Sequence, residues 1–250
     1  MVFSIRKPLK IFVIAAFWLL LWQILSVLVG KSVLLPSPFE VASRLAVLFF
    51  EKSFWLSVGN SLLRILLGFV LGTALGILFA VLTFRFPLVR SFLSPFLSVI
   101  KATPVASFIV LAFITLSAGS IPVLTAVLVV LPGVWASTET GLREIDPQLL
   151  EMAKAFQMPR SRRLTAVIFP SLAPYFLAVI HSAMGMAWKA GIAAEVICPY
   201  GDSLGHELYN AKIYLETPDL FAWTAVVILF SVLFEKLFLH LMKRKETPHA

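Results

Sequence analysis

The sequence predicts an all-α integral membrane protein with six transmembrane helices. Hydrophobic residues make up 60% of the chain and charged residues only 14%, whereas a typical soluble domain has about 25% charged residues. Phenylalanine alone occurs 22 times among 250 residues. The apolar residues also gather in long runs separated by short basic segments, which is the pattern of a helical membrane protein.

Six segments are long enough to cross a bilayer, which needs roughly 20 apolar residues for about 30 Å of hydrocarbon. A charge-free run from Ala102 to Thr138 is too long for one crossing, so we divide it at the turn sequence SAGSIP at 117–122. The expected crossings are 11–29, 62–84, 92–117, 121–140, 171–196 and 220–241. We therefore treat residues 1–250 as a single transmembrane domain.

The first crossing follows a basic N-terminus, as the apolar region of a signal peptide would. The uncharged run from Ile11 to Val29 is longer than such a region, which has about 7–15 residues. We expect it to be retained as a transmembrane helix.

Basic residues predict the orientation, because Lys and Arg accumulate in cytoplasmic loops. With a cytoplasmic N-terminus, the outer segments hold only Lys31, Arg44, Lys52 and Lys212. The inner segments hold Arg6, Lys7, Lys10, Arg85, Arg90, Arg143, Lys154, Arg160, Arg162, Arg163, Lys236, Lys243, Arg244 and Lys245. Both termini and the loop 142–170 are then expected in the cytoplasm.

An outer helix is expected over residues 38–50. Ser37 and Glu40 have the spacing of a capping box, and Pro38 suits the first helical position. Its apolar side chains fall on one face, so we expect this helix to lie at the membrane interface.

The cytoplasmic loop 142–170 has the pattern of two short helices. Asp146 and Pro147 form a helix start, Pro159 ends that helix, and a second can begin at Ser161. Two interpretations follow from periodicity alone. The loop is either an amphipathic linker resting on the membrane or a compact projection that docks on a partner.

The same loop resembles the cytoplasmic loop of ABC importer permeases. The family pattern is Glu-Ala-Ala, three residues, Gly, nine residues, then Ile-x-Leu-Pro. This chain keeps the spacing throughout, with Glu151, Ala153 and Pro170 matching in identity. It departs from the pattern at Met152, Gln157, Val167 and Phe169, and Gln157 stands where the family has Gly. Segments 34–41, 61–77 and 187–197 are similar to the nitrate/sulfonate/taurine-type branch.

The resemblance implies a type I permease fold and one subunit of an ATP-driven importer of a small solute, with an anion as one candidate. It further implies a second permease copy, two ATPase subunits and an extracytoplasmic solute-binding protein. ATP and Mg²⁺ would bind the ATPase, so no cofactor is expected on this chain. The location would be the inner membrane of a prokaryote, among lipid. The implied ATPase-docking residues are Glu151, Met152, Ala153, Phe156, Gln157, Pro159, Arg160 and Ser161.

Two lysines lie inside expected crossings. A cation at mid-membrane costs about 2.5–3.5 kcal/mol on insertion scales, so it usually faces a cavity or a partner. Lys101 and Lys189 are therefore candidates to line a path for an anionic solute. A structural ion pair or snorkelling is the alternative. For His181, in the fifth crossing, we favour a packed, hydrogen-bonded role over a proton relay.

Gly68, Gly72 and Gly76 recur every fourth residue. Small residues at this spacing let helix backbones approach closely. The stripe predicts helix packing, either within one subunit or at a dimer seam.

Other function classes have little support. The net charge of +8 reflects topology, so nucleic acid is not an expected partner, and one cysteine, Cys198, excludes an intrachain disulfide. The GKS at 30–32 lacks the preceding glycine of a phosphate-binding loop, because Leu25 occupies that position. We expect no catalytic residues and no metal site. The alternative function is a stand-alone secondary transporter or channel.

Overall fold

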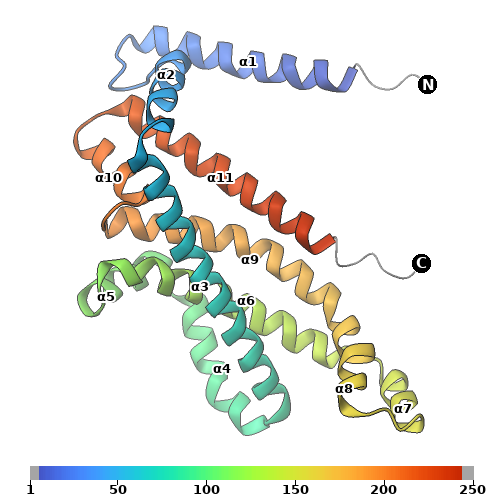
Figure 1. The fold of residues 1–250 in the computed structure, drawn as a ribbon. Coiled ribbons are helices and arrows are strands. Elements are labelled where there is room, and N and C mark those ends of the chain that lie inside the picture. Colours follow the sequence, from blue (N-terminus) through green and yellow to red (C-terminus); the bar gives the residue numbers. More distant parts are fainter. Residues whose placement is uncertain (1–5, 244–250) are drawn as a thin grey trace.

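The computed structural model describes residues 6–243, and every regular element in that part is helical (Figure 1). The long helices are α1 (Arg6–Val29), α3 (Lys52–Arg85), α6 (Ile121–Arg143), α9 (Phe169–Ile197) and α11 (Thr217–Lys243). The shorter elements are α2 (Pro38–Phe49), α4 (Pro87–Ala102), α5 (Val105–Thr115), the 3₁₀ turn η1 (Ala118–Ser120), α7 (Pro147–Ala155), α8 (Arg160–Arg163), the π-helical turn η2 (Leu164–Ile168) and α10 (Leu204–Ile213).

The centre of the molecule is formed by α3, α6 and α9, with α3 packed along α6 and α6 along α9. The main apolar cluster joins these helices to α11. Within it, Trp188 of α9 is buried, and its indole N–H donates to the carbonyl oxygen of Val227 on α11 at 3.2 Å. Helix α1 is attached differently, because none of the residues in its most apolar stretch is buried within this chain.

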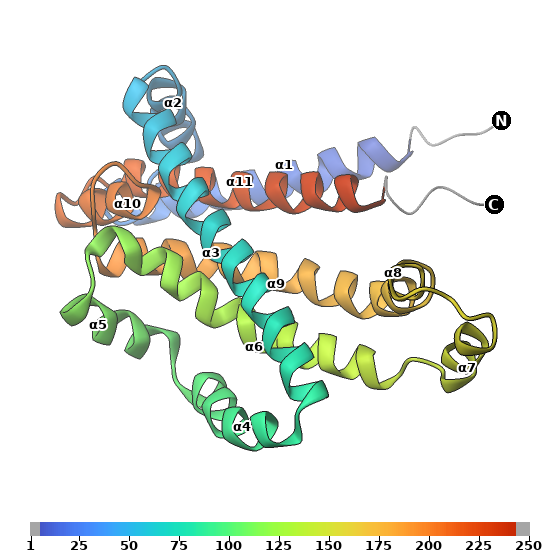
Figure 2. The ribbon, with the colours of Figure 1, turned by 60° about the horizontal axis from the view of Figure 1, so that its bottom comes forward.

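Five helices are long and apolar enough to cross a membrane, or six if the bent pair α4 and α5 forms one crossing. The sequence predicts one crossing over 92–117, with a kink from Pro95 and Pro104, which flank Lys101. The structure instead has two helices that meet at 104° (Figure 2). Thr103 is extended at the break, with φ −79° and ψ 129°, and Pro104 follows it. A residue before proline is held out of the helical region, and proline offers no backbone N–H to continue a helix.

Helices α2 and α10 cover one end of the bundle. The predicted capping box of α2 is present: the Glu40 carboxylate accepts the backbone N–H of Ser37 at 2.7 Å, and the Glu40 N–H donates back to the Ser37 hydroxyl. The bond from the Ser37 N–H lowers the pKa of Glu40. A bidentate ion pair between Arg44 and Asp219 fastens α2 to the first turn of α11.

The opposite end carries α7 and α8. In both views the first turn of α1 and the last turn of α11 point toward the same end as α7 and α8, whereas α2, α5 and α10 lie at the other end (Figures 1 and 2). The elements that the sequence assigns to the two sides of the membrane are thus separated in space.

Candidate functional site

Helix α7 begins where the sequence predicts. The side chain of Asp146 accepts the backbone N–H of Gln148 at 2.8 Å, and Pro147 occupies the first helical position. Only three residues separate α7 from the end of α6 at Arg143, and one of them, Ile145, is buried. A short, anchored connection of this kind ties the direction of α7 to that of α6.

The end of α7 is a Schellman motif built on Gln157. The N–H of Met158 donates to the carbonyl of Ala153 at 2.9 Å, and the N–H of Gln157 donates to that of Lys154 at 2.9 Å. This motif needs a left-handed residue, and Gln157 has φ 49°. The family pattern has Gly here, which adopts that conformation without steric cost. This chain therefore makes the same turn with a residue that carries a side chain.

The chain after the turn runs without interruption into the membrane. Pro159 precedes α8, and α8, η2 and α9 form one helical stretch from Arg160 to Ile197. The π-helical turn η2 ends at Ile168, two residues before Pro170, whose ring in a regular helix would clash with the carbonyl four residues earlier. The two arms of the loop thus join α6 and α9, which pack on each other.

Most of the predicted docking residues are exposed on this projection. Phe156 is 74% exposed and Met152 43%, and Glu151, Gln157, Pro159, Arg160 and Ser161 are exposed as well. Ala153 is the exception, at 1% exposure. Its side chain is enclosed within this chain, where α7 packs against η2. Ala153 therefore shapes the loop and offers no surface to a partner.

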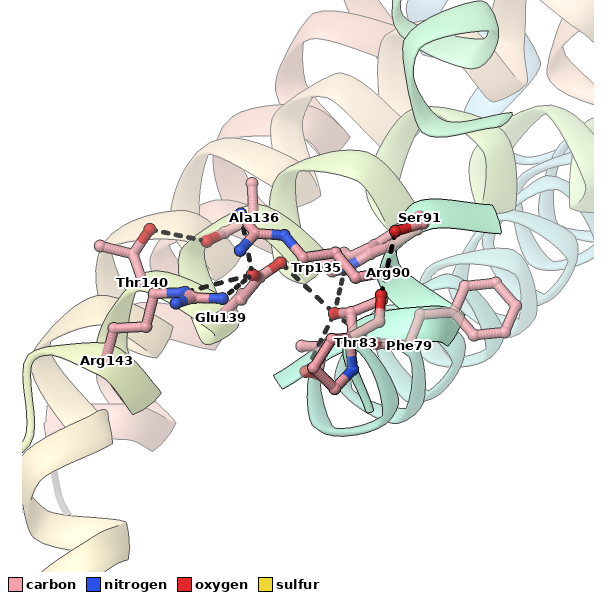
Figure 3. Close-up of polar contacts among 11 residues, drawn as sticks. Phe79, Thr83, Arg90, Ser91, Trp135, Ala136, Glu139, Thr140 and Arg143 are labelled. Atoms are coloured by element: carbon pink, nitrogen blue, oxygen red, sulfur yellow. Dashed lines mark hydrogen bonds and ion pairs between the residues drawn. The ribbon is translucent and has the colours of Figure 1, made fainter. Parts of the chain in front are cut away.

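A polar network lies just inside the membrane-proximal base of this loop (Figure 3). Glu139 of α6 accepts two hydrogen bonds from the Arg143 guanidinium, at 2.9 and 3.2 Å, and its carboxylate lies 3.4 Å from Nη2 of Arg90 on α4. The other carboxylate oxygen is 3.3 Å from the hydroxyl of Thr83 on α3. Behind them the buried Trp135 donates its indole N–H to Thr83 at 3.0 Å. The sequence analysis did not predict this network. Its one signal in the sequence is Glu139, an acidic residue one helical turn before Arg143.

Lys101 and Lys189 are both exposed in this chain and belong to different helices, α4 and α9. Lys101 lies at the break between α4 and α5, where it lines a cavity of ≈ 190 Å³ together with Thr103, Phe108 and Thr125. No ion pair joins either lysine to an acidic residue in the part of the chain that is described. His181 forms an interhelical pair, with Nε2 3.0 Å from a carboxylate oxygen of Glu235 on α11.

The glycine stripe of α3 lies against α6 of the same chain. A Cβ added to Gly68 would come within 2.5 Å of the Val123 carbonyl oxygen, and one added to Gly76 within 2.9 Å of the Val134 side chain. Gly72 is equally close to Val130, at 3.0 Å. The stripe therefore serves packing within the subunit, the first of the two alternatives above.

A second buried polar group lies near the end of the bundle that carries α2 and α10. Glu195 of α9 is 1% exposed and accepts bonds from the Ser61 hydroxyl at 2.6 Å and the Gly205 N–H at 3.2 Å, with Arg64 of α3 3.6 Å away. The Arg64 guanidinium also lies over the ring of Tyr200. These contacts fasten α10 to α3 and α9. The contacts of Ser61 and Arg64 with Glu195 join residues more than a hundred positions apart, so no local pattern identifies them.

Comparison with known proteins shows which family has this architecture. Residues 72–246 match the family of binding-protein-dependent transport system inner membrane components. A probable ABC transporter permease protein of Brucella melitensis is 27% identical over 208 residues, covering 82% of this chain and 84% of that protein. The taurine transport system permease protein of Escherichia coli is 25% identical, covering 98% of this chain and 90% of that protein. The nitrate import permease protein of Synechococcus elongatus is 24% identical, covering 82% and 77%.

The fold is also found among solved structures. A chain in the crystal structure of an amino acid ABC transporter with histidines superposes with a TM-score of 0.63 at 17% identity, covering 80% of this chain and 97% of that one. The family match and this fold agree with the expected type I permease architecture, and they exclude the alternative of a stand-alone carrier or channel. This multi-pass chain therefore belongs to the binding-protein-dependent transport system inner membrane components, as an ABC transporter permease.

Proposed function

We propose that the chain converts ATP hydrolysis by separate ATPase subunits into solute import, with the loop 142–170 as the contact for the ATPase. The observation that carries this proposal is the exposed surface of α7 and α8, led by Phe156 and Met152, at the end of the bundle opposite α2 and α10. An exposed Phe on a compact helical projection is typical of a side chain that fills a pocket in a partner.

The loop is suited to transmit force because both of its arms are short and helical. One arm reaches α6 through three residues, and the other continues into α9. Ser137 of α6 donates its hydroxyl to the carbonyl of Tyr175 on α9 at 2.9 Å, close to the base of the loop. A displacement of α7 and α8 is therefore passed to two helices that move as a pair. ATP and Mg²⁺ bind the ATPase in this scheme, and the hydrolysis takes place there.

The complete transporter holds two copies of this permease and two ATPase subunits, with both permease termini in the cytoplasm. An extracytoplasmic binding protein delivers the solute to the surface around α2 and α10. The ion pair of Arg44 with Asp219 and the contacts of Glu195 with Ser61 and Gly205 support this role, because they hold that surface rigid for docking.

We propose a small anion as the solute. The relatives are named for taurine and nitrate transport. Lys101 fits an anion, since it borders a cavity at the interruption between α4 and α5 and has no acidic partner among the described residues. The cavity of ≈ 190 Å³ suits a molecule of a few heavy atoms. Lys189, exposed on α9, is a second candidate contact.

Replacement of Phe156 tests the docking contact. Burying a Phe side chain contributes about 1.5–3 kcal/mol, so Phe156→Ala should raise the Kd for the ATPase subunit about tenfold to a hundredfold. The measurement is binding of the purified ATPase to the permease in nanodiscs. Phe86→Ala is the matched control, because Phe86 is also exposed and lies in the turn between α3 and α4. Equal ATPase affinity for wild type and Phe156→Ala, or an equal loss with Phe86→Ala, would refute the proposal.

A further inference from the structure

The polar network of Glu139, Arg143, Arg90 and Thr83 joins three helices at one carboxylate. Arg143 belongs to the last turn of α6, Arg90 to the first turn of α4, and Thr83 to the end of α3. The Glu139 side chain is only 14% exposed, whereas the two arginines are about half exposed. The carboxylate is therefore the shielded centre of the network, and the guanidinium groups close it off from the aqueous side.

The three contacts differ in strength. Arg143 approaches with two N–H groups at hydrogen-bond distance, while Arg90 pairs at 3.4 Å. Thr83 has a single hydroxyl hydrogen, and its nearest acceptor is the Phe79 carbonyl at 2.8 Å, ahead of Glu139 at 3.3 Å. The link to Arg143 within α6 is thus the firm one. The link to Arg90 is the interhelical one, and it connects α4 to α6 through the same carboxylate.

Helix α4 has few other attachments. Of its residues, all of them described, only Ile100 is buried. Leu93 and Leu97 pack partly against a small cluster of Ala80, Leu131 and Trp135. The chain enters α4 through the extended residue Phe86 and leaves it through the break at Thr103. The pair of Arg90 with Glu139 is therefore the main polar contact that sets the angle of α4 against α6.

The two ends of α4 lie at different functional places. Its first turns hold Arg90, close to the base of the loop 142–170, and its last turn holds Lys101 beside the cavity. The helix has 16 residues, which is about 24 Å at 1.5 Å per residue. A rotation of α4 as one body at the Arg90 end would therefore displace the end that borders the cavity.

We propose that Glu139 is a positioning residue that transmits the movement of the loop 142–170 to α4, and through α4 to the cavity bordered by Lys101. This inference rests on the proposed docking of an ATPase at that loop. When α7 is displaced, the last turn of α6 moves with it, and Glu139 draws Arg90 and the start of α4 along.

Hydrogen exchange in the assembled complex tests this without knowledge of the solute. The probe is a nonhydrolysable ATP analogue with Mg²⁺, added to the permease–ATPase complex in nanodiscs. In wild type, the analogue should change amide exchange in both α7 and α4. In Glu139→Gln, which keeps the size of the side chain but removes its charge, the α7 response should persist while the α4 response falls by at least about threefold.

Three further variants make the result specific. Arg90→Met should reproduce the loss of the α4 response. The double variant Glu139→Gln/Arg90→Met should lose no more of that response than either single variant, because both substitutions remove the same contact. Arg85→Met is the control, since Arg85 is an exposed basic residue at the end of α3 outside the network. If Glu139→Gln fails to assemble with the ATPase, Arg90→Met decides the question, because Arg90 is itself exposed and its replacement leaves Glu139 paired with Arg143.

The possible results separate the inference from the proposed function. An α4 response that survives both Glu139→Gln and Arg90→Met, or that is absent from wild type while α7 responds, overturns the inference and leaves the proposed function intact. A wild-type complex in which the analogue leaves α7 unchanged counts against the proposed function itself. A loss of the α4 response with Arg85→Met would show a general loosening of α4 and would also overturn the inference.

Discussion

Gln157 has the clearest local effect of any single residue in the loop. Its φ of 49° completes the Schellman motif that ends α7, so the turn direction depends on one residue in a left-handed conformation. A side chain in this region costs roughly 1–2 kcal/mol relative to its usual conformations. The turn persists because Met158 and Gln157 both find acceptors in the last turn of α7.

Gln157→Gly should therefore tighten the turn. We expect a gain of about 1 kcal/mol in the local opening free energy and about fivefold slower exchange of the Met158 amide. Gln157→Val should have the opposite effect, because a β-branched residue is strained at positive φ. The amide of Glu216 is an internal reference, since it closes the same motif at Leu215, just after the end of α10. Faster exchange at Met158 in Gln157→Gly would contradict this account.

The sequence predicts residue-scale features where the signal is local. The capping box of Ser37 and Glu40 and the start of α7 at Asp146 are present as expected, because each depends on residues within one helical turn. The partners of Glu195 and Glu139 on other helices could not be predicted in this way. Glu195 meets Ser61 on another helix, and sequence spacing alone does not give the distance between helices.

At the scale of elements, the sequence predicts where helices stop better than how sharply they turn. The prolines around Lys101 indicate a kink in the third crossing, and the structure places a 104° bend there. Proline removes one donor and restricts the residue before it, but the final angle depends on what each half packs against. Here α5 packs on α6 and α9, while α4 stays close to α3. The packing of α3 on α6 is more regular, because the glycine stripe sets it directly.

Gly68→Ala tests that packing. The added methyl group would lie 2.5 Å from the Val123 carbonyl oxygen and 2.6 Å from the Cβ of Ala126, so α3 and α6 must separate. We expect a loss of about 1–3 kcal/mol, seen as a lower thermal midpoint of the purified permease. Gly59→Ala on the same helix meets nothing within 4 Å and should leave the midpoint nearly unchanged. A midpoint in Gly68→Ala equal to that of Gly59→Ala would show that close approach of α3 and α6 is not required.

At the scale of the whole molecule, the helical bundle separates two chemically different ends, one with α7 and α8 and the other with α2 and α10. The end with α7 and α8 carries Arg143, Arg160, Arg162 and Arg163, as expected for a cytoplasmic surface. The end with α2 and α10 is joined by acid–base contacts, among them Arg44 with Asp219. The basic asymmetry of the loops predicts this separation, because it depends on the order of segments and not on their packing.

Cysteine labelling tests the orientation. A membrane-impermeant maleimide added to intact cells should label Ser43→Cys on α2 and leave Thr165→Cys on η2 unlabelled until the cells are lysed. Both positions are exposed in this chain, and the native Cys198 is buried, so wild type provides the blank. Labelling of Thr165→Cys in intact cells would reverse the assigned orientation.

The interruption at Thr103 and Pro104 has a consequence for hydration. A continuous helix satisfies its own peptide groups, but a helix that stops and restarts at an angle leaves carbonyls at the end of α4 and amides at the start of α5 without helical partners. Inside a bilayer such groups persist only where protein or water meets them. The cavity beside Lys101 lies at this break, so water held there would meet these peptide groups, and an arriving solute would exchange one polar shell for another.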